Sequence, residues 1–221
     1  LKFLDWCDNE LWNKKELDDD SKIIFHRACN EFYKEKTNQR LDKFYEKTAL
    51  KDIEYIINGN RIPSLADLFK NLDWDSIVNG TASDFHGDLQ FDNVLYMGQN
   101  NFKLLDWRQD FGGLLEYGDL YYDLSKLYGG MVLSYKSIKD NKFSFDMSGD
   151  KVYYQYEMSS TLIESREVFE KFVVSKGYSL DKIKLITSLI FLNMSPLHND
   201  PFDHLLYFLG KNMLFKQLKN R

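Results

Sequence analysis

The sequence has few of the features that mark membrane, zinc-binding or multi-domain proteins. It has three prolines, no low-complexity segment and no apolar run near the roughly twenty residues that a helix needs to cross a bilayer. The two cysteines, Cys7 and Cys29, have neither CxxC spacing nor nearby histidines, so we expect free thiols in a reducing cytoplasm. With 221 residues, 43% of them hydrophobic, the chain can bury a sizeable core, and we expect a single domain over residues 1–221.

The most informative stretch is SDFHGDLQFDNVLYM, at residues 83–97. It places His86, Asp88 and Asn93 in the order H-x-D-x-x-x-x-N, and a second acid, Asp106, ends the next apolar run. In phosphoryl transfer this spacing provides one acid that orients a hydroxyl and accepts its proton, and an Asn and an acid that bind Mg²⁺. The sequence therefore predicts Asp88 as a catalytic residue and Asn93 and Asp106 as ligands of Mg²⁺ or Mn²⁺. His86 belongs to the same catalytic group. For His86 we favour packing and hydrogen bonding that hold the loop over a part in proton transfer.

Two β-hairpins are expected. The first joins residues 93–97 to residues 102–107 through the turn-forming segment 98–101, which brings Asn93 beside Asp106. The second joins residues 142–147 to residues 152–156. One of its faces is expected to pack on helices, and Tyr153, on the other face, is a candidate acceptor-binding residue through its aromatic ring.

Elsewhere the spacing of apolar residues predicts helices over residues 4–36 with a break near 18–20, and over 41–56, 63–72, 119–128, 157–176, 179–194 and 202–219. Asp119 lies at a helix start, where capping and loop support are favoured over direct catalysis. Asp123 lies one turn further along, and we expect it to hydrogen-bond the backbone of the catalytic loop. The expected fold class is α+β and mainly helical, with a catalytic-loop hairpin and a second small hairpin.

The motifs HGDLQFDN at residues 86–93, LLDW at 104–107, the glycines Gly112 and Gly113, and GDLYYDLSKL at 118–127 together resemble the aminoglycoside phosphotransferase and choline kinase family. The resemblance covers residues 84–128. It implies the C-terminal lobe of a protein-kinase-like fold, with Asp88, Asn93 and Asp106 in the roles given above. It also implies ATP or GTP as co-substrate and the hydroxyl of a small molecule as acceptor.

The sequence departs from that family at its beginning. A complete member begins with a small β-rich lobe that carries a glycine-rich loop over the phosphates and a lysine that pairs with them. The first glycine here is Gly59, and no β-rich run with a candidate lysine precedes it. We therefore expect these residues to be the C-terminal lobe of a longer polypeptide, with the N-terminal nucleotide-binding lobe absent from this chain and the isolated fragment inactive.

Acidic residues are concentrated near the motif. The chain has a net charge of −5, and residues 84–123 carry eight acids against two bases. Such a concentration favours a bound cation and a cationic acceptor, although Asp84, Asp92 and Asp110 are expected to be solvated or to cap helices. A nucleic-acid partner is not expected, because no basic face with interleaved aromatic residues is visible.

The sequence thus predicts a Mg²⁺-dependent phosphotransferase that moves the γ-phosphoryl group of ATP or GTP to an amino alcohol, an aminoglycoside or a sugar. The residues of these motifs most resemble those of bacterial members of this family that are associated with surface-polysaccharide synthesis. Protein-kinase activity is disfavoured, because the segment after Asp106 has no A-P-E signature and no long activation segment. The alternative is a non-catalytic kinase-like binding or regulatory module of a larger polypeptide. The presence of Asp88, Asn93 and Asp106 favours an enzyme. The missing N-terminal lobe keeps the non-catalytic module as an alternative.

Overall fold

Helices make up most of this chain. The computed structural model describes residues 1–219, so Asn220 and Arg221 of the expected domain lie outside the described residues. The helices are α1 (Lys2–Trp6), α2 (Asp19–Asn30), α3 (Lys36–Thr48), α4 (Leu65–Lys70), α5 (Trp74–Val78), α6 (Leu120–Val132), α7 (Tyr135–Lys139), α8 (Ser160–Ser175), α9 (Leu180–Met194) and α10 (Phe202–Lys219). The strands are β1 (Tyr55–Ile57), β2 (Asn60–Ile62), β3 (Ala82–Ser83), β4 (Val94–Gly98), β5 (Asn101–Leu104), β6 (Gly118–Asp119), β7 (Phe143–Ser148) and β8 (Lys151–Tyr156). The expected α+β, mainly helical class is confirmed.

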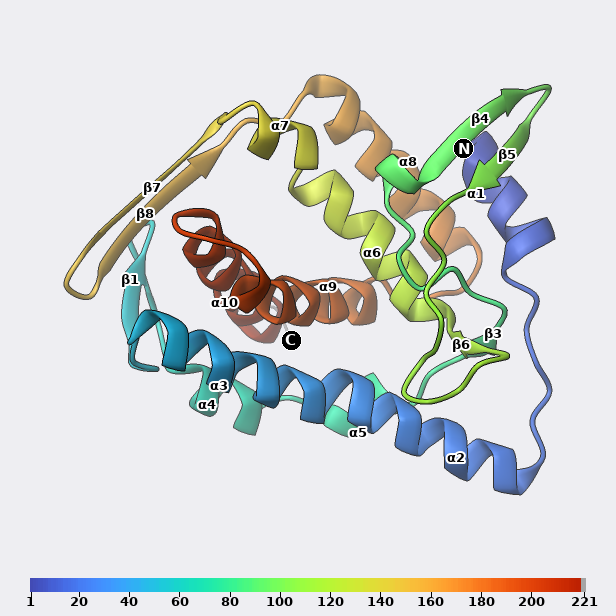
Figure 1. Ribbon diagram of the computed structural model, residues 1–221, viewed down its shortest axis with the longest axis horizontal. Coiled ribbons are helices and arrows are strands. Elements are labelled where there is room, and N and C mark those ends of the chain that lie inside the picture. Colours follow the sequence, from blue (N-terminus) through green and yellow to red (C-terminus); the bar gives the residue numbers. More distant parts are fainter. Residues whose placement is uncertain (220–221) are drawn as a thin grey trace.

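Helices α2 and α3 form one long rod along an edge of the molecule (Figure 1). The side chain of Asp18 caps its start by accepting a hydrogen bond from the backbone N–H of Ser21 at 2.8 Å. A π-helical turn, Glu31–Glu35, joins the two helices without interrupting the rod. This rod places Lys36 and Arg40 of α3 in the same cavity as Asp88 of the predicted catalytic loop, residues 84–93.

The helix predicted over residues 41–56 is wrong in its second half. Helix α3 ends at Thr48, because Ala49 takes the left-handed conformation with φ 57°. The following residues form strand β1, in which alternate side chains are buried. Positive φ angles at Asn58 and Gly59 make the tight turn that pairs β1 with β2, so strand pairing overrides the apparent helical spacing.

Two further helix boundaries differ from the prediction. Residues 12–18, between α1 with its π-helical continuation Cys7–Leu11 and α2, lie alongside β3 through hydrogen bonds such as Lys15 N–H to Ala82 O. Helix α6 continues through the two glycines at 129–130 to Val132, because it packs lengthwise on α9. The remaining predicted helices are confirmed within a few residues.

Both predicted hairpins are present. Strands β4 and β5 pair with each other, and β7 and β8 belong to a sheet with the order β2-β1-β8-β7. In the β7–β8 hairpin, Val152 and Tyr154 face the core, and the Phe145 ring stacks on Phe208 of α10 at 5.8 Å between centroids. Tyr153 lies on the opposite face and is 53% exposed, as its position in the alternating pattern predicts.

Helix α9 is the centre of the core and packs against α3, α6 and α10 (Figure 1). Ten of its 15 residues are buried, including every residue from Leu185 to Leu192, which is typical of a helix covered on every side. Cys7 and Cys29 are buried free thiols, as predicted, and burial raises the pKa of both well above the ordinary value.

Among residues 1–219, no helix combines the length and the apolar character that crossing a bilayer requires.

Candidate active site

The predicted catalytic loop, residues 84–93, is held by helix α6. Asp123 of α6 is fully buried, and its carboxylate accepts hydrogen bonds from the backbone N–H groups of His86 and Gly87, both at 2.7 Å. The indole N–H of Trp12 donates to the same carboxylate at 3.3 Å. Burial raises the pKa of Asp123 and outweighs the backbone donors and His86, which lower it, so that the resulting pKa is about 6. The structure therefore confirms the predicted contact between Asp123 and the loop backbone.

Asp119 is the N-cap of α6, and it also ties the site to the long rod. Its carboxylate accepts hydrogen bonds from the backbone N–H groups of Thr81 at 2.8 Å and Tyr121 at 3.1 Å, and from the Tyr33 hydroxyl at 2.7 Å. Burial raises the pKa of this carboxyl, which these donors and Lys182 oppose. The predicted capping role is confirmed, and the side chain is fully buried.

His86 joins the catalytic loop to the segment that carries Asp106. Its Nε2 lies 2.7 Å from the carbonyl oxygen of Leu105, and the backbone N–H of Asp88 lies 3.1 Å from its Nδ1. Because a carbonyl oxygen only accepts, Nε2 carries the proton and Nδ1 accepts the hydrogen bond from Asp88. Both ring nitrogens are thus engaged in a fully buried ring that packs on Trp107. This geometry makes His86 a positioning residue.

Gly87 allows the loop to approach the segment after β5. Its φ is +80°, and a Cβ at this position would lie 2.3 Å from Cβ of Arg108 and 2.8 Å from the Phe85 ring. The backbone N–H of Arg108 donates to the carbonyl of His86 at 2.9 Å, so the two segments cannot separate without losing this bond. Only glycine fits here without displacing one of them.

We expect Gly87→Ala to lower the free energy of unfolding by about 2 to 4 kcal/mol, because it adds left-handed strain to a clash with backbone-anchored neighbours. Chemical denaturation measures the change. Gly98→Ala is the matched control: its φ is +86°, but nothing lies within 4 Å of the added Cβ, so strain alone costs about 1 to 2 kcal/mol. Equal losses in the two variants would contradict the close approach at Gly87.

Asp88 lies at the centre of the loop, with its carboxylate half-buried. One carboxylate oxygen, Oδ1, forms an ion pair with Nζ of Lys126 on α6 at 2.6 Å. The amide of Asn93 donates to the backbone carbonyl of Asp88 at 2.9 Å, and Gln90 Nε2 lies 3.4 Å from Oδ2. The carboxylate is therefore oriented by contacts from both the loop and α6.

The β4–β5 hairpin brings Asn93 and Asp106 together, as predicted. Val94 pairs with Leu104, and the backbone N–H of Leu105 donates to the carbonyl of Asn93 at 2.9 Å, which places Asp106 one residue beyond this pair. Asp106 takes the left-handed conformation with φ 57°, which Asp tolerates better than most residues. Such a conformation at the end of a strand turns the chain and presents the exposed carboxylate at the loop.

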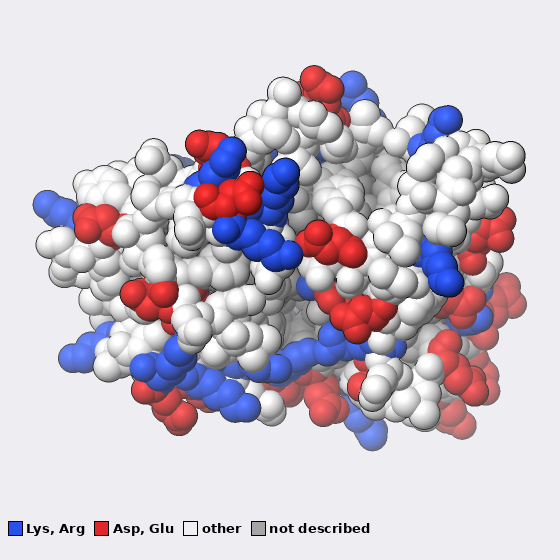
Figure 2. Space-filling model, turned by 45° about the horizontal axis from the view of Figure 1, so that its top comes forward, with Lys and Arg blue, Asp and Glu red and all other residues white. Residues whose placement is uncertain are grey.

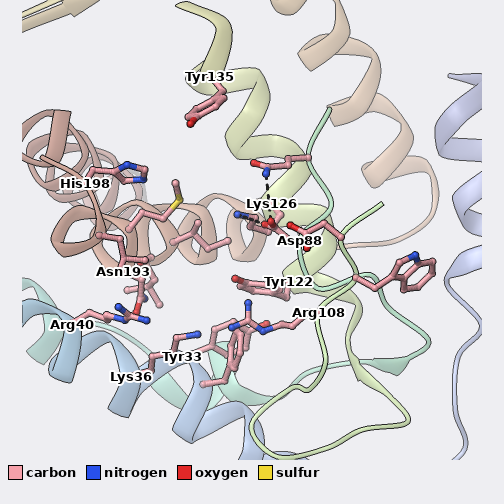
Figure 3. Close-up of a pocket in the computed structure, with 18 residues that line it drawn as sticks. Tyr33, Lys36, Arg40, Asp88, Arg108, Tyr122, Lys126, Tyr135, Asn193 and His198 are labelled. Atoms are coloured by element: carbon pink, nitrogen blue, oxygen red, sulfur yellow. Dashed lines mark hydrogen bonds and ion pairs between the residues drawn. The ribbon is translucent and has the colours of Figure 1, made fainter. Parts of the chain in front are cut away.

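A cavity of about 460 Å³ opens beside Asp88 and Asp106, between α3, α6 and the end of α9 (Figure 3). This volume is in the range of small-molecule sites. The cavity is lined by Phe32, Tyr33, Lys36, Arg40, Asp88, Gln90, Asp106, Trp107, Arg108, Tyr122, Lys126, Tyr135, Leu189, Ile190, Asn193, Met194, Leu197 and His198.

The charge of the cavity differs from that of the motif segment. Its walls carry the two acids Asp88 and Asp106, and four cations from three parts of the chain: Lys36 and Arg40 on α3, Arg108 after β5, and Lys126 on α6. The space-filling view shows basic side chains along the lower rim of a central hollow, with acidic side chains beside it (Figure 2). The prediction of acidic surroundings, made from residues 84–123, is therefore wrong for this cavity. The fold adds Lys36, Arg40 and Lys126, which lie outside that segment.

The structure brings some predicted site residues together and not others. Asp88 and Asp106 line the cavity, and Asn93 contacts Asp88 behind it. His86, Asp119 and Asp123 are buried around the loop and support it. Tyr153 is not among the lining residues; it borders a separate hollow between β7, β8 and the β1–β2 turn.

Sequence reasoning missed four residues. The most important is Lys126, which pairs with Asp88. A signal for it was present: Lys126 follows Asp123 by three residues, so both lie on the helix face that meets the catalytic loop. Lys36 and Arg40 gave no such signal, because they are far from the motif in the sequence. Arg108 follows Asp106 by two residues, but nothing in the sequence indicated that it meets α3.

No family model, curated protein or solved structure matches this chain. The residues of the cavity and their contacts are therefore the basis for the functional proposal.

Proposed function

We propose that this chain is the catalytic-loop and acceptor-binding lobe of a small-molecule phosphotransferase, similar to the aminoglycoside phosphotransferase and choline kinase family. The observation that carries the proposal is that Asp88 and Asp106 line one cavity, while Asn93 is hydrogen-bonded to the backbone of Asp88. In this reaction the bond between the γ-phosphorus and its bridging oxygen breaks, and a hydroxyl oxygen of the acceptor forms the new bond. The nucleoside diphosphate leaves.

Asp88 would orient the acceptor hydroxyl and accept its proton. The contacts from Lys126 and Gln90 fix the direction of its carboxylate, which reduces the cost of orienting the reactants. Lys126 also places a cation next to the reacting hydroxyl. A cation in this position stabilises the negative charge of the phosphoryl group that is transferred. His86 acts on this arrangement only by holding the loop.

Asn93 and Asp106 fit a divalent cation such as Mg²⁺ or Mn²⁺. The amide nitrogen of Asn93 is used by Asp88, and within residues 1–219 its Oδ1 accepts no hydrogen bond. In the same part of the chain, the Asp106 carboxylate forms neither an ion pair nor a hydrogen bond. Both are hard oxygen donors of the kind that Mg²⁺ prefers, and a bound cation would offset charge on the nucleotide phosphates.

The nucleotide, ATP or GTP, would also require groups that cover its phosphates. Residues 1–48 are mainly helical and contain no glycine, so they provide no such loop. We therefore include in the proposal an N-terminal nucleotide-binding lobe outside these residues. A non-catalytic module of a larger polypeptide is the second candidate, favoured by the same lack of a phosphate-covering loop.

Transfer of label from γ-³²P-ATP or GTP tests the proposal, with amino alcohols, aminoglycosides, sugars and sugar phosphates as acceptors in the presence of Mg²⁺. We expect a polypeptide that joins this chain to its nucleotide-binding lobe to label at least one of these acceptors. Residues 1–221 alone are expected to bind ATP weakly and to transfer negligible label, because much of the electrostatic clamp on the phosphates is missing. Robust steady-state transfer by residues 1–221 alone would contradict the need for a second lobe. Absence of transfer from the joined protein to every acceptor class would favour the non-catalytic module.

A further inference from the structure

The cavity contains a cluster of cations that the chemistry at Asp88 does not use. Lys36 and Arg40 are four residues apart on α3 and therefore lie on one helix face, and Arg108 reaches the cavity from the segment after β5 (Figure 3). Nζ of Lys36 and Cζ of Arg108 lie 4.1 and 5.0 Å from the centroid of the same Phe32 ring. Three cations thus converge on one wall of the cavity. We call Lys36, Arg40 and Arg108 the basic wall.

The basic wall has no anionic partner in the part of the chain that is described. Within residues 1–219, no carboxylate forms an ion pair with any of its three members, whereas Lys126 in the same cavity is paired with Asp88. Like charges this close repel one another. Burial, together with repulsion from Arg108 and Arg40, lowers the pKa of Lys36 to about 8, although the nearby carboxylate of Asp110 opposes this shift. An anion that binds between these side chains would relieve this repulsion.

We propose that the acceptor of this site carries a phosphate group, which Lys36, Arg40 and Arg108 bind while Asp88 faces its hydroxyl. The inference rests on the proposed phosphotransferase function and adds the substrate class. Guanidinium groups donate paired hydrogen bonds to phosphate oxygens, and three cations match a dianionic phosphate better than a singly charged carboxylate. The aromatic side chains of Tyr122 and Trp107 in the same cavity provide a surface for the rest of the molecule.

The binding of inorganic phosphate to residues 1–221, followed by calorimetry and by NMR of the lysine and arginine side chains, tests the basic wall without requiring activity. We expect Lys36→Gln and Arg40→Gln each to weaken phosphate binding by about tenfold, the effect of losing one charge-assisted contact. Lys43→Gln is the matched control. Lys43 does not line the cavity that holds Asp88, but it borders a second hollow that the three wall residues also line. If phosphate binds in the cavity beside Asp88, its binding to Lys43→Gln should stay within about twofold.

A pH series isolates Lys36. The charged groups that face it are Arg40 on α3, Arg108 and Asp110 from the segment after β5, and Lys126 on α6. Asp88, Asp106 and His198 line the same cavity, and burial lowers the pKa of His198 below its ordinary value. Lys36 is charged below its pKa of about 8. In the pH range where the phosphate is dianionic, its affinity should therefore be highest below that pKa and should fall as the pH rises above it. Lys36→Arg keeps its charge and should remove this decline.

Each result bears on one of the two proposals. Equal phosphate binding in Lys36→Gln, Arg40→Gln and the natural chain would overturn the basic wall, as would an equal loss in Lys43→Gln. Displacement of phosphate by Mg²⁺–ATP would assign the wall to the nucleotide and overturn the acceptor assignment. Transfer to neutral alcohols that is unaffected by Lys36→Gln would overturn the acceptor assignment alone. Phosphate binding that depends on the wall, in a joined protein that phosphorylates no acceptor of any class, would overturn the phosphotransferase assignment and leave the anion site.

Discussion

Asp88→Asn in the active enzyme is expected to lower turnover by at least about a hundredfold, the lower end of a general-base contribution, with small changes in the KM of either substrate. The amide keeps the size of the side chain and its contact with Gln90, but it accepts a proton far less readily. Steady-state kinetics of phosphoryl transfer measure the effect. The variant also removes the partner of Lys126, whose side chain is only 10% exposed, so unfolding experiments should show a loss below about 2 kcal/mol.

Asp92→Asn is the control for Asp88→Asn. Asp92 belongs to the same loop and carries the same charge, but its side chain is exposed and does not line the cavity with Asp88. We expect near-normal turnover from it. Near-normal turnover in Asp88→Asn would contradict the proposed role of Asp88. An equal loss of turnover in both variants would show that the total charge of the loop, and not the Asp88 carboxylate, supports activity.

Asp106→Asn should abolish activity even at saturating Mg²⁺, because it replaces a charged oxygen ligand by a neutral amide. Asn adopts the left-handed conformation of residue 106 as readily as Asp does, so the fold should be unchanged. Calorimetry of nucleotide binding with and without Mg²⁺ measures how much of the nucleotide affinity depends on the metal and is lost in the variant. Unchanged nucleotide–metal binding would show that the cation is held elsewhere.

Two further variants separate charge from backbone strain at this position. Asp106→Gly removes the carboxylate but relieves the strain of a positive φ, so we expect equal or higher stability together with lost activity. Glu116→Gln removes an exposed acid from the same segment and should leave activity near normal. Retained activity in Asp106→Gly would contradict the ligand role of Asp106.

The contacts of Asp123 and His86 explain why both variants should act locally. The Asp123 carboxylate holds the loop by accepting hydrogen bonds from two of its backbone N–H groups, and the His86 ring joins the loop to the carbonyl of Leu105. Neither contact uses the carboxylates of Asp88 or Asp106. The loop should therefore keep its conformation when either carboxylate is neutralised, and activity should change without loss of the fold.

The sequence by itself determined the parts of this protein that depend on neighbouring residues. Turn-forming residues between two β-prone runs specify the hairpin that brings Asn93 to Asp106, and alternation places Tyr153 on the exposed face of the second hairpin. Helical spacing placed Asp123 one turn beyond the cap, where it meets the catalytic loop. These features follow from local backbone preferences and short-range pairing.

Only the tertiary structure decided the parts that join distant segments. Strand β1 had a local signal in the Asn58-Gly59 turn that pairs it with β2, which the prediction from helical spacing missed. Its pairing with β8 joins residues almost a hundred positions apart, and no local signal indicates it. The partner of Asp88 comes from α6, and the basic wall joins α3 to the segment after β5. Charges from segments that are far apart in the sequence meet only when the helices pack, so the local excess of acids near the motif did not determine the charge of the cavity.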